Sequence, residues 1–230
     1  MKGGSLEGFW MNKRWLLVIL LFFVMPSDPA FALTTREVVK RVQEQYGQIF
    51  SLTANFTQES TNKMLGQTRR AKGKVYLEKE GLMRWEYATS PKNVWVSDGK
   101  TLWFYQPEET QVFIQRVDPE KGSLFLTFLV GEGDLARDFE IQGIEEEAGE
   151  TEKGYRIGLT PREPHAMMSR MTLMVDRETY HVHQAEVYDA YDNLTRTRFS
   201  RIRINRDLCR ELFTFEIPPG TEVIENPGLE

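Results

Sequence analysis

The chain has 230 residues, of which 40% are hydrophobic, 27% charged and 12% aromatic. This composition is typical of a folded domain and too apolar for a disordered chain. The single cysteine excludes a disulfide scaffold and a cysteine-ligated metal cluster, and the net charge of −5 argues against a general nucleic-acid binder.

The first 32 residues have the pattern of a secretory signal peptide. A basic pair precedes the apolar run Trp15 to Val24, and a small-x-small cleavage pattern ends at Ala32. The apolar run is short for a membrane span. We therefore expect cleavage after residue 32 and a soluble, exported domain over residues 33–230, with an uncleaved anchor as the competing interpretation. The following residue is Leu33 rather than cysteine, so we do not expect a lipoprotein anchor.

The segment after the cleavage site opens with an amphipathic helix. Thr34 and Glu37 form a capping-box pattern. Apolar residues then recur at helical spacing: Val38, Val42, Tyr46 and Ile49. We expect one helix with a single buried stripe.

After this helix the apolar period changes to two, which is typical of half-buried strands. Asp98-Gly99 lies between two such runs and predicts a tight hairpin. The predicted strands are 52–56, 71–77, 83–87, 93–96, 101–105, 111–116, 139–144, 155–159, 171–175, 182–188, 195–204 and 213–217. They predict a mainly β fold in which a meandering antiparallel sheet curls into a barrel. Cys209 is expected in the core as a small apolar residue.

The segment from Ser123 to Val130 breaks the alternating pattern. Ser123 as N-cap and the glycines after the segment predict a short helix. This helix is apolar nearly all round and does not suit an ordinary surface. It either fills the barrel as core or covers an apolar cavity as a lid.

Other groups of side chains have plain structural interpretations. His181 and His183 share a strand face, but no third ligand is apparent, so we expect no metal site. The methionines within 167–174 suit either a soft binding surface or ordinary packing. The basic stretch Arg196–Arg210 forms either a solvated face or a docking surface. The sequence has no nucleophile elbow, phosphate loop or zinc-helix motif, and we expect neither an enzyme nor a cofactor.

Five short motifs occur in order along the segment after residue 32. They are Phe56-Thr57-Gln58, Gly73-Lys74-Val75-Tyr76, Met83-Arg84-Trp85, the stretch from Val96 to Tyr105, and Phe213-Thr214-Phe215 followed by Pro219-Gly220. Together they resemble the outer-membrane lipoprotein carrier (LolA) family, and the stretch from Val96 to Tyr105 is the specific part.

The resemblance implies a half-closed antiparallel β-barrel with a helical lid over an apolar cavity. It also implies a monomeric periplasmic chaperone that takes triacylated lipoproteins from an inner-membrane ABC transporter to an outer-membrane receptor. Physical chemistry fits this role, because each acyl methylene kept from water contributes about 0.8 kcal/mol. A periplasmic carrier of another lipid or glycolipid, using the same cavity, is the alternative.

The resemblance also implies which residues form the site. The expected cavity and lid residues are Phe56, Met83, Trp85, Leu124, Phe125, Phe128 and Leu129. Family members often carry an arginine that holds the lid shut, and the matching position here is Lys79. Lysine lacks the planar fork of arginine, so we expect a weaker or differently built latch at Lys79 or nearby Arg84.

Overall fold

The structure, a computed structural model, describes four ranges of the chain: 33–117, 124–148, 153–165 and 167–226. All of them belong to the compact unit Leu33–Glu230. The expected signal peptide and the predicted N-cap Ser123 lie outside the described residues. Within these ranges, no helix combines the length and the apolar character needed to cross a bilayer.

Helix α1 (Thr35–Gly47) begins where the capping box predicts. The Glu37 amide donates to Thr34 Oγ1 at 3.3 Å, and the Thr34 amide donates to the Glu37 carboxylate at 2.8 Å. The bond from the Thr34 amide, followed by one from the Thr34 hydroxyl at 2.7 Å, lowers the pKa of the Glu37 carboxyl. The predicted stripe is confirmed, since Val38, Val42 and Tyr46 are all buried. The helix therefore presents one apolar face to the sheet.

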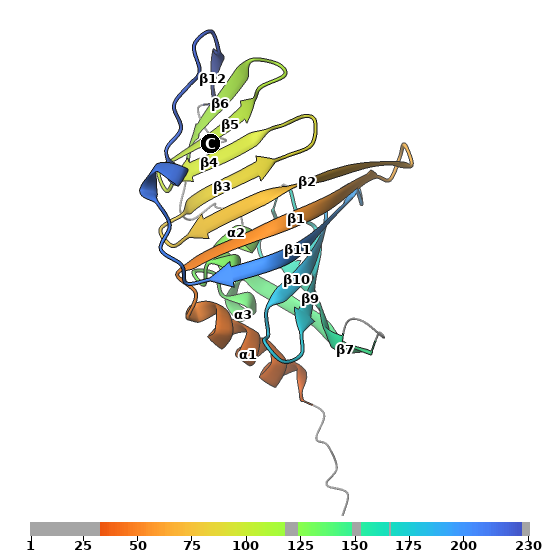
Figure 1. The fold of residues 1–230 in the computed structure, drawn as a ribbon. Helices are drawn as coiled ribbons and strands as arrows, with labels where there is room; N and C mark the ends of the chain where they lie inside the picture. Colours follow the sequence, from red (N-terminus) through yellow and green to blue (C-terminus); the bar gives the residue numbers. More distant parts are fainter. Residues whose placement is uncertain (1–32, 118–123, 149–152, 166, 227–230) are drawn as a thin grey trace, which may run out of the picture. The chain divides into compact units, whose positions relative to one another are not determined.

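Twelve strands in the described ranges form one curved, open sheet (Figure 1). They are β1 (Ser51–Asn62), β2 (Gln67–Glu78), β3 (Leu82–Tyr87), β4 (Val94–Asp98), β5 (Thr101–Gln106), β6 (Gln111–Arg116), β7 (Phe139–Ala148), β8 (Lys153–Pro161), β9 (Arg170–Asp176), β10 (Val182–Tyr188), β11 (Leu194–Ile204) and β12 (Glu222–Asn226). Their spatial order is β12-β6-β5-β4-β3-β2-β1-β11-β10-β9-β8-β7. The expected mainly β, half-closed architecture is confirmed, and β12 and β7 are its two edges.

The β4–β5 hairpin forms at Asp98-Gly99 as predicted. Gly99 has a φ of 86°, a left-handed conformation that favours glycine. Asp98 Oδ1 accepts hydrogen bonds from the amides of Lys100 at 2.8 Å and Thr101 at 2.7 Å, which closes the turn. This turn fixes which side chains of β4 and β5 lie opposite one another.

Helices α1, α2 (Leu124–Leu129) and α3 (Leu135–Asp138) pack on one face of the sheet, which we call the inner face (Figure 1). Their buried side chains and those of the sheet form one hydrophobic core cluster. Helix α2 confirms the predicted short helix. Helix α3 was not predicted; it is capped by Asp134, whose Oδ1 accepts from the amides of Ala136 and Arg137 at 2.9 Å.

The C-terminal segment covers part of the opposite, outer face of the sheet. The predicted strand 213–217 is wrong: Arg210–Phe213 is a 3₁₀ helix (η1), and the residues after it are not in a strand. Phe213 is buried, and Phe215 lies 5.5 Å from Tyr105 between ring centroids. The alternating apolar residues therefore pack on top of the sheet rather than extend it. Strand β12, not predicted, then pairs with β6 in parallel, unlike the antiparallel pairs elsewhere in the described sheet.

Cys209 is exposed, so the expectation that it lies in the core is wrong. It precedes η1 in an irregular segment and contacts the carboxylate of Glu211. Its hydrogen bond to Glu211 raises the pKa of the thiol. The prediction of a buried cysteine is wrong because Cys209 follows the end of β11, where the chain runs along the surface.

Candidate functional site

A row of aromatic side chains crosses the inner face of the sheet. The rings of Phe56 (β1) and Trp85 (β3) are 4.7 Å apart between centroids, and Trp85 lies directly opposite Trp95 (β4). Trp95 stacks on Phe104 (β5) at 3.9 Å. Phe104 in turn stacks on Phe113 (β6) at 6.0 Å. Because opposed residues in neighbouring strands share a face, these five rings form one apolar wall, which we call the aromatic row.

The cover over the aromatic row decreases from one end to the other. Phe56 is 1% exposed and Trp85 9% exposed. Trp95, Phe104 and Phe113 are only half-buried. The row therefore begins in the core cluster and ends on a surface that the described residues cover incompletely.

Two further side chains extend the wall on β3. Met83 shares the face of Trp85 and packs, partly buried, against the core cluster. Tyr87 donates its hydroxyl to Gln58 Oε1 at 2.9 Å, and burial raises the pKa of this hydroxyl. Tyr87 and Gln58 thus supply a polar margin to an otherwise apolar surface.

Helix α2 packs against the buried end of the aromatic row. Phe125 lies 6.3 Å from Phe199 (β11), whose ring is 6.2 Å from that of Trp85. Phe128 lies 4.5 Å from Tyr46 of α1. Phe125, Phe128 and Leu129 are all buried in the core cluster. The helix therefore fills the space between α1 and the sheet with its own apolar side chains.

The structure brings most of the predicted cavity and lid residues together. The core cluster contains Phe56, Trp85, Phe125, Phe128 and Leu129, and Met83 packs against it. Leu124 begins α2, but its side chain lies outside the described part of the structure.

The C-terminal end of α2 is tied to α1 by hydrogen bonds. Gln43 Nε2 donates to the carbonyl of Gly133 at 2.8 Å, and Gln43 Oε1 accepts from the amide of Leu135 at 3.0 Å. Glu132 accepts at 2.7 Å from the amide of Glu80, in the β2–β3 turn. One glutamine side chain therefore bridges two backbone groups just after α2, and a carboxylate adds a third link to the sheet.

Gly131 allows the chain after α2 to pass close to α1. Its φ is 73°, and a Cβ atom at this position would lie 2.0 Å from the carbonyl oxygen of Tyr46. Both the conformation and the contact require glycine. The turn after α2 is therefore tightly fitted against the end of α1.

The two predicted latch residues make different contacts, Lys79 from the β2–β3 turn and Arg84 from β3. Lys79 Nζ is 3.5 Å from the carbonyl oxygen of Gly47, the last residue of α1. Arg84 alternates with Trp85 and so lies on the outer face, where it donates to Glu86 at 2.6 Å and to the carbonyl of Leu212 at 3.2 Å. Lys79 thus contacts the end of α1, and Arg84 contacts η1.

The histidines and methionines have ordinary structural surroundings. Across the described ranges, no three potential ligands are grouped as a metal site requires. His181 Nε2 is 3.2 Å from Gln45 Nε2, and burial lowers the pKa of His181. Met168 and Met171 are buried as core, whereas Met167 is 74% exposed.

The exposed half of the aromatic row, formed by Trp95, Phe104 and Phe113, is absent from the site predicted by sequence. A signal for it existed in the hairpin turn. A two-residue turn at Gly99-Lys100, between Asp98 and Thr101, sets Trp95 opposite Phe104, as the pairing of β4 with β5 shows. Alternation alone left the choice of face open.

Comparisons with known proteins are consistent with this geometry. The family model for "Outer membrane lipoprotein carrier protein LolA" matches residues 47–216. The chain is 30% identical to an outer-membrane lipoprotein carrier protein of Nitrosomonas europaea over 93% of this chain and 99% of the relative. It is 27% identical to an outer-membrane lipoprotein carrier protein of Legionella pneumophila strain Corby, over 94% of this chain and 100% of the relative.

A solved structure resembles the fold. It is that of an uncharacterized conserved protein from Thermus thermophilus, with a TM-score of 0.51 and 12% identity. The likeness covers 83% of this chain and 98% of the other. At this identity it bears on the fold alone.

Proposed function

This chain belongs to the outer-membrane lipoprotein carrier family, and on that premise we propose that it carries lipoproteins through the periplasm. The first 32 residues are removed as a signal peptide during export. An inner-membrane ABC transporter hands over triacylated lipoproteins, and an outer-membrane receptor takes them. The carrier works as a monomer and performs no chemistry on its cargo.

The half-covered aromatic row is the observation that supports this proposal most directly. From Phe56 to Phe113 the row crosses five interstrand spacings, roughly 24 Å at about 4.8 Å each. Acyl chains need a long apolar surface, since each methylene removed from water contributes about 0.8 kcal/mol. We assign the row, together with Met83, as the wall along which the acyl chains lie.

Helix α2 serves as the lid in this proposal. Phe125, Phe128 and Leu129 belong to the hydrophobic core cluster, and we assign to them the apolar space that acyl chains fill in the loaded carrier. An empty carrier is thereby stabilised by its own side chains, and cargo binding shifts the equilibrium toward a state with α2 displaced. Leu124 is assigned to the same lid. The links of Gln43 and Glu132 keep the C-terminal end of α2 in place while the rest of the helix moves.

We assign Lys79 an indirect part in the latch, because its ammonium group contacts the end of α1, against which α2 packs. Lys79→Leu is expected to change the rates of cargo loading and release more than the free energy of unfolding. Transfer kinetics identical to those of the wild type would remove Lys79 from the mechanism. Arg84→Leu is the comparison variant, expected to affect the η1 contact and not the lid.

A release assay tests the carrier function. The protein, purified from the periplasm after export, is added to spheroplasts that hold a newly made outer-membrane lipoprotein. We expect lipoprotein to appear in the soluble fraction as a one-to-one complex, and only when the carrier is present. Absence of release with a working transporter would contradict the proposal, and the mass of lipid that co-purifies would then identify another lipid or glycolipid as the ligand.

The variants Phe125→Glu and Met83→Glu test the site itself. Each places a charge among the acyl chains, so complex formation is expected to fall at least about tenfold. Circular dichroism checks that the fold is retained. If both variants still form the complex as well as the wild type, the assignment of the cavity is wrong.

A further inference from the structure

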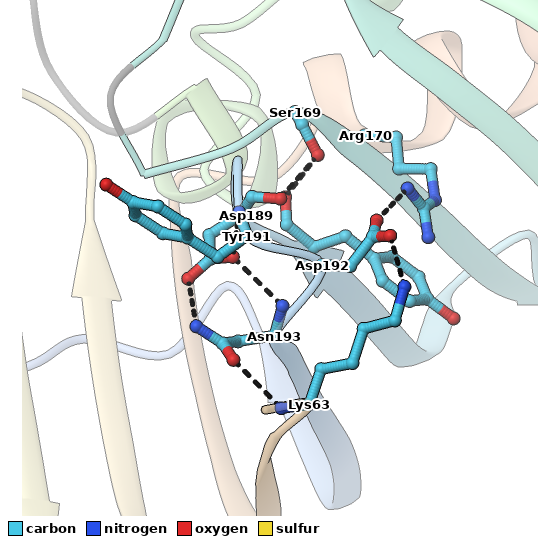
Figure 2. A network of polar contacts seen from close by, with 8 residues as sticks. Lys63, Ser169, Arg170, Asp189, Tyr191, Asp192 and Asn193 are labelled. Atoms are coloured by element: carbon cyan, nitrogen blue, oxygen red, sulfur yellow. Dashed lines mark hydrogen bonds and ion pairs between the residues drawn. The ribbon is translucent and has the colours of Figure 1, made fainter. Parts of the chain in front are cut away.

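Three loops meet at one end of the sheet and are joined by polar contacts (Figure 2). Lys63, in the β1–β2 turn, donates from Nζ to Asp192 at 2.6 Å and from its backbone amide to Asn193 Oδ1 at 3.0 Å. Arg170 donates to the other carboxylate oxygen of Asp192 at 2.6 Å. Residues 62–66, 162–165, 167–169 and 189–193 contribute to this surface, which we call the loop end.

The turn between β10 and β11 is fixed by its own contacts as well. Asp189 Oδ1 accepts from the amides of Tyr191 at 2.8 Å and Asn193 at 2.9 Å. Ser169 Oγ donates to the carbonyl of Asp189 at 2.8 Å (Figure 2). The hydrogen bond from Lys63, followed by that from Arg170, lowers the pKa of Asp192, so this carboxylate stays charged at neutral pH. These contacts hold the loops in position relative to one another.

Four large apolar side chains nevertheless project from the loop end. The exposed fractions are 89% for Met64, 64% for Leu65, 74% for Met167 and 80% for Tyr191. The other exposed large apolar residues of the described ranges are less open: Phe50 at 42%, Ile217 at 40% and Val223 at 45%. Such a concentration of apolar side chains at one end of the molecule marks an interaction surface.

The β1–β2 hairpin that carries Met64 and Leu65 is strongly basic. Residues 60–77 hold five basic side chains and no acidic one, in a chain with a net charge of −5. The five are Lys63, Arg69, Arg70, Lys72 and Lys74, all exposed. An apolar tip with flanking cations complements a membrane surface that carries anionic headgroups.

A groove of about 460 Å³ lies beside this hairpin. Arg70, Lys72 and Arg198 contribute to its walls, together with Thr57 and Glu59. Guanidinium and ammonium groups bind phosphate through charge-assisted hydrogen bonds. Arg70 already donates to Glu59 Oε1 at 2.8 Å, so Lys72 and Arg198 are the groove cations that could bind a lipid phosphate, several residues along the hairpin from its apolar tip.

We propose that the loop end is a bilayer-contact site, at which Met64, Leu65, Met167 and Tyr191 enter the interface of a phospholipid membrane. Lys63 is paired with Asp192 and Arg70 with Glu59, so Arg69, Lys72 and Lys74 are the basic side chains of the β1–β2 hairpin that bind the anionic headgroups. The apolar side chains are distributed over three loops, and a lipid interface accepts them without shape complementarity. Tyrosine is moreover enriched at such interfaces. The proposal does not depend on the carrier function.

Vesicle flotation without any lipoprotein tests the proposal. The protein purified after export is mixed with vesicles of phosphatidylglycerol and phosphatidylethanolamine, and separately with vesicles of phosphatidylcholine. We expect binding to the anionic vesicles that weakens with salt. Met64→Ser/Leu65→Ser is expected to bind about tenfold more weakly, since two apolar side chains no longer enter the interface. The matched control is Ile217→Ser/Val223→Ser, expected to bind as the wild type does.

Insertion of the tip is measured directly with a polarity-sensitive dye. Cys209→Ser removes the single cysteine, and Met64→Cys or Val223→Cys then accepts an NBD label. We expect NBD emission to rise on vesicle addition at position 64 and to stay unchanged at position 223.

Several outcomes would overturn the proposal. Absence of wild-type binding to anionic vesicles would do so and would leave a protein as the partner of the loop end. Equal binding by the Met64→Ser/Leu65→Ser variant, or equal NBD emission at both positions, would contradict insertion even if electrostatic adsorption occurs. Because no lipoprotein is present, none of these results depends on whether the release assay succeeds.

Discussion

The two halves of the sheet use the same inner face in different ways. In the β8–β9 half the inward side chains are fully covered: Ile157, Leu173 and Val175 are each 0% exposed. In the β4–β6 half, Trp95 and Phe104 are only half-buried, although each side chain is larger than those of Ile157, Leu173 and Val175. Helices α1 and α2 share one core cluster with the first half, and the aromatic row leads from that cluster to the second.

The difference in cover means that one half of the sheet stabilises the fold while the other half keeps apolar surface for a ligand. A fully covered apolar side chain has already contributed its hydrophobic free energy, about 1.5–3 kcal/mol, to folding. A half-covered one retains part of that free energy for a ligand. The β8–β9 half therefore stabilises the fold, and the β4–β6 half provides the surface to which acyl chains bind in the proposed function.

The largest expected effect is a difference in the free energy of unfolding between core variants in the two halves of the sheet. Leu173→Ala leaves a cavity in the covered half and is expected to lower the free energy of unfolding by about 3 kcal/mol. Phe104→Ala is expected to cost about 1 kcal/mol, because it loses mainly ring stacking, yet to weaken lipoprotein binding. Urea unfolding monitored by circular dichroism measures both. Similar losses of stability in the two variants would contradict the division.

Gly131→Ala tests the fit of the turn after α2 against α1. The left-handed φ and the contact with the Tyr46 carbonyl are expected to lower the free energy of unfolding by about 2 kcal/mol. Gly66→Ala is the matched comparison, since Gly66 has a similar φ of 62° but nothing lies within 4 Å of a Cβ there. If the loss at position 66 equals or exceeds that at position 131, the close approach of the turn to α1 is wrong.

Gln43→Ala removes the hydrogen bonds that tie the end of α2 to α1. Two backbone groups lose their side-chain partner, so a cost of about 1–2 kcal/mol is expected. Amide exchange at Leu135 is expected to accelerate together with lipoprotein release. Gln142→Ala, at an exposed position, serves as the control. Unchanged exchange at Leu135 would show that this link does not restrain the lid.

The smallest expected effect is a dependence of stability on pH. Burial lowers the pKa of His181 in the folded state, so the unfolded chain takes up a proton more readily. The free energy of unfolding therefore decreases as the pH falls through the ordinary histidine pKa, about 6.5, and the contribution is complete above it. His181→Gln is expected to flatten this slope between about pH 7 and pH 5, while His183→Gln is the matched control. An unchanged slope in His181→Gln would assign the dependence to other groups.

Local patterns predicted most of the elements, because alternation and capping act over a few residues. The capping box set the start of α1, and Asp98-Gly99 set the β4–β5 hairpin. The same alternation at Phe213 and Phe215 predicted a strand where the chain instead packs on the outer face. Alternating apolar residues indicate that one side of a segment is buried. An extended segment that packs on the face of a sheet shows this pattern, and so does a strand within the sheet.

Long-range features were less accessible from sequence. Strand β12 has only two apolar residues in five, and its parallel pairing with β6 depends on where the C-terminal segment returns. The predicted wall stopped at Trp85 because no short-range pattern says which strand faces are left without cover. The links between Gln43 and the turn after α2 join residues about ninety positions apart, which no local spacing indicates.

Photo-crosslinking from adjacent positions tests the central claim most directly. Phe104 lies on the inner face in the aromatic row, whereas Trp103 lies on the outer face, 6.4 Å from Phe215 between ring centroids. A benzoylphenylalanine placed at position 104 is expected to crosslink lipoprotein in the periplasm, and one placed at position 103 is not. Equal crosslinking from both positions, or crosslinking from position 103 alone, would contradict the assignment of the aromatic row as the surface that binds the acyl chains.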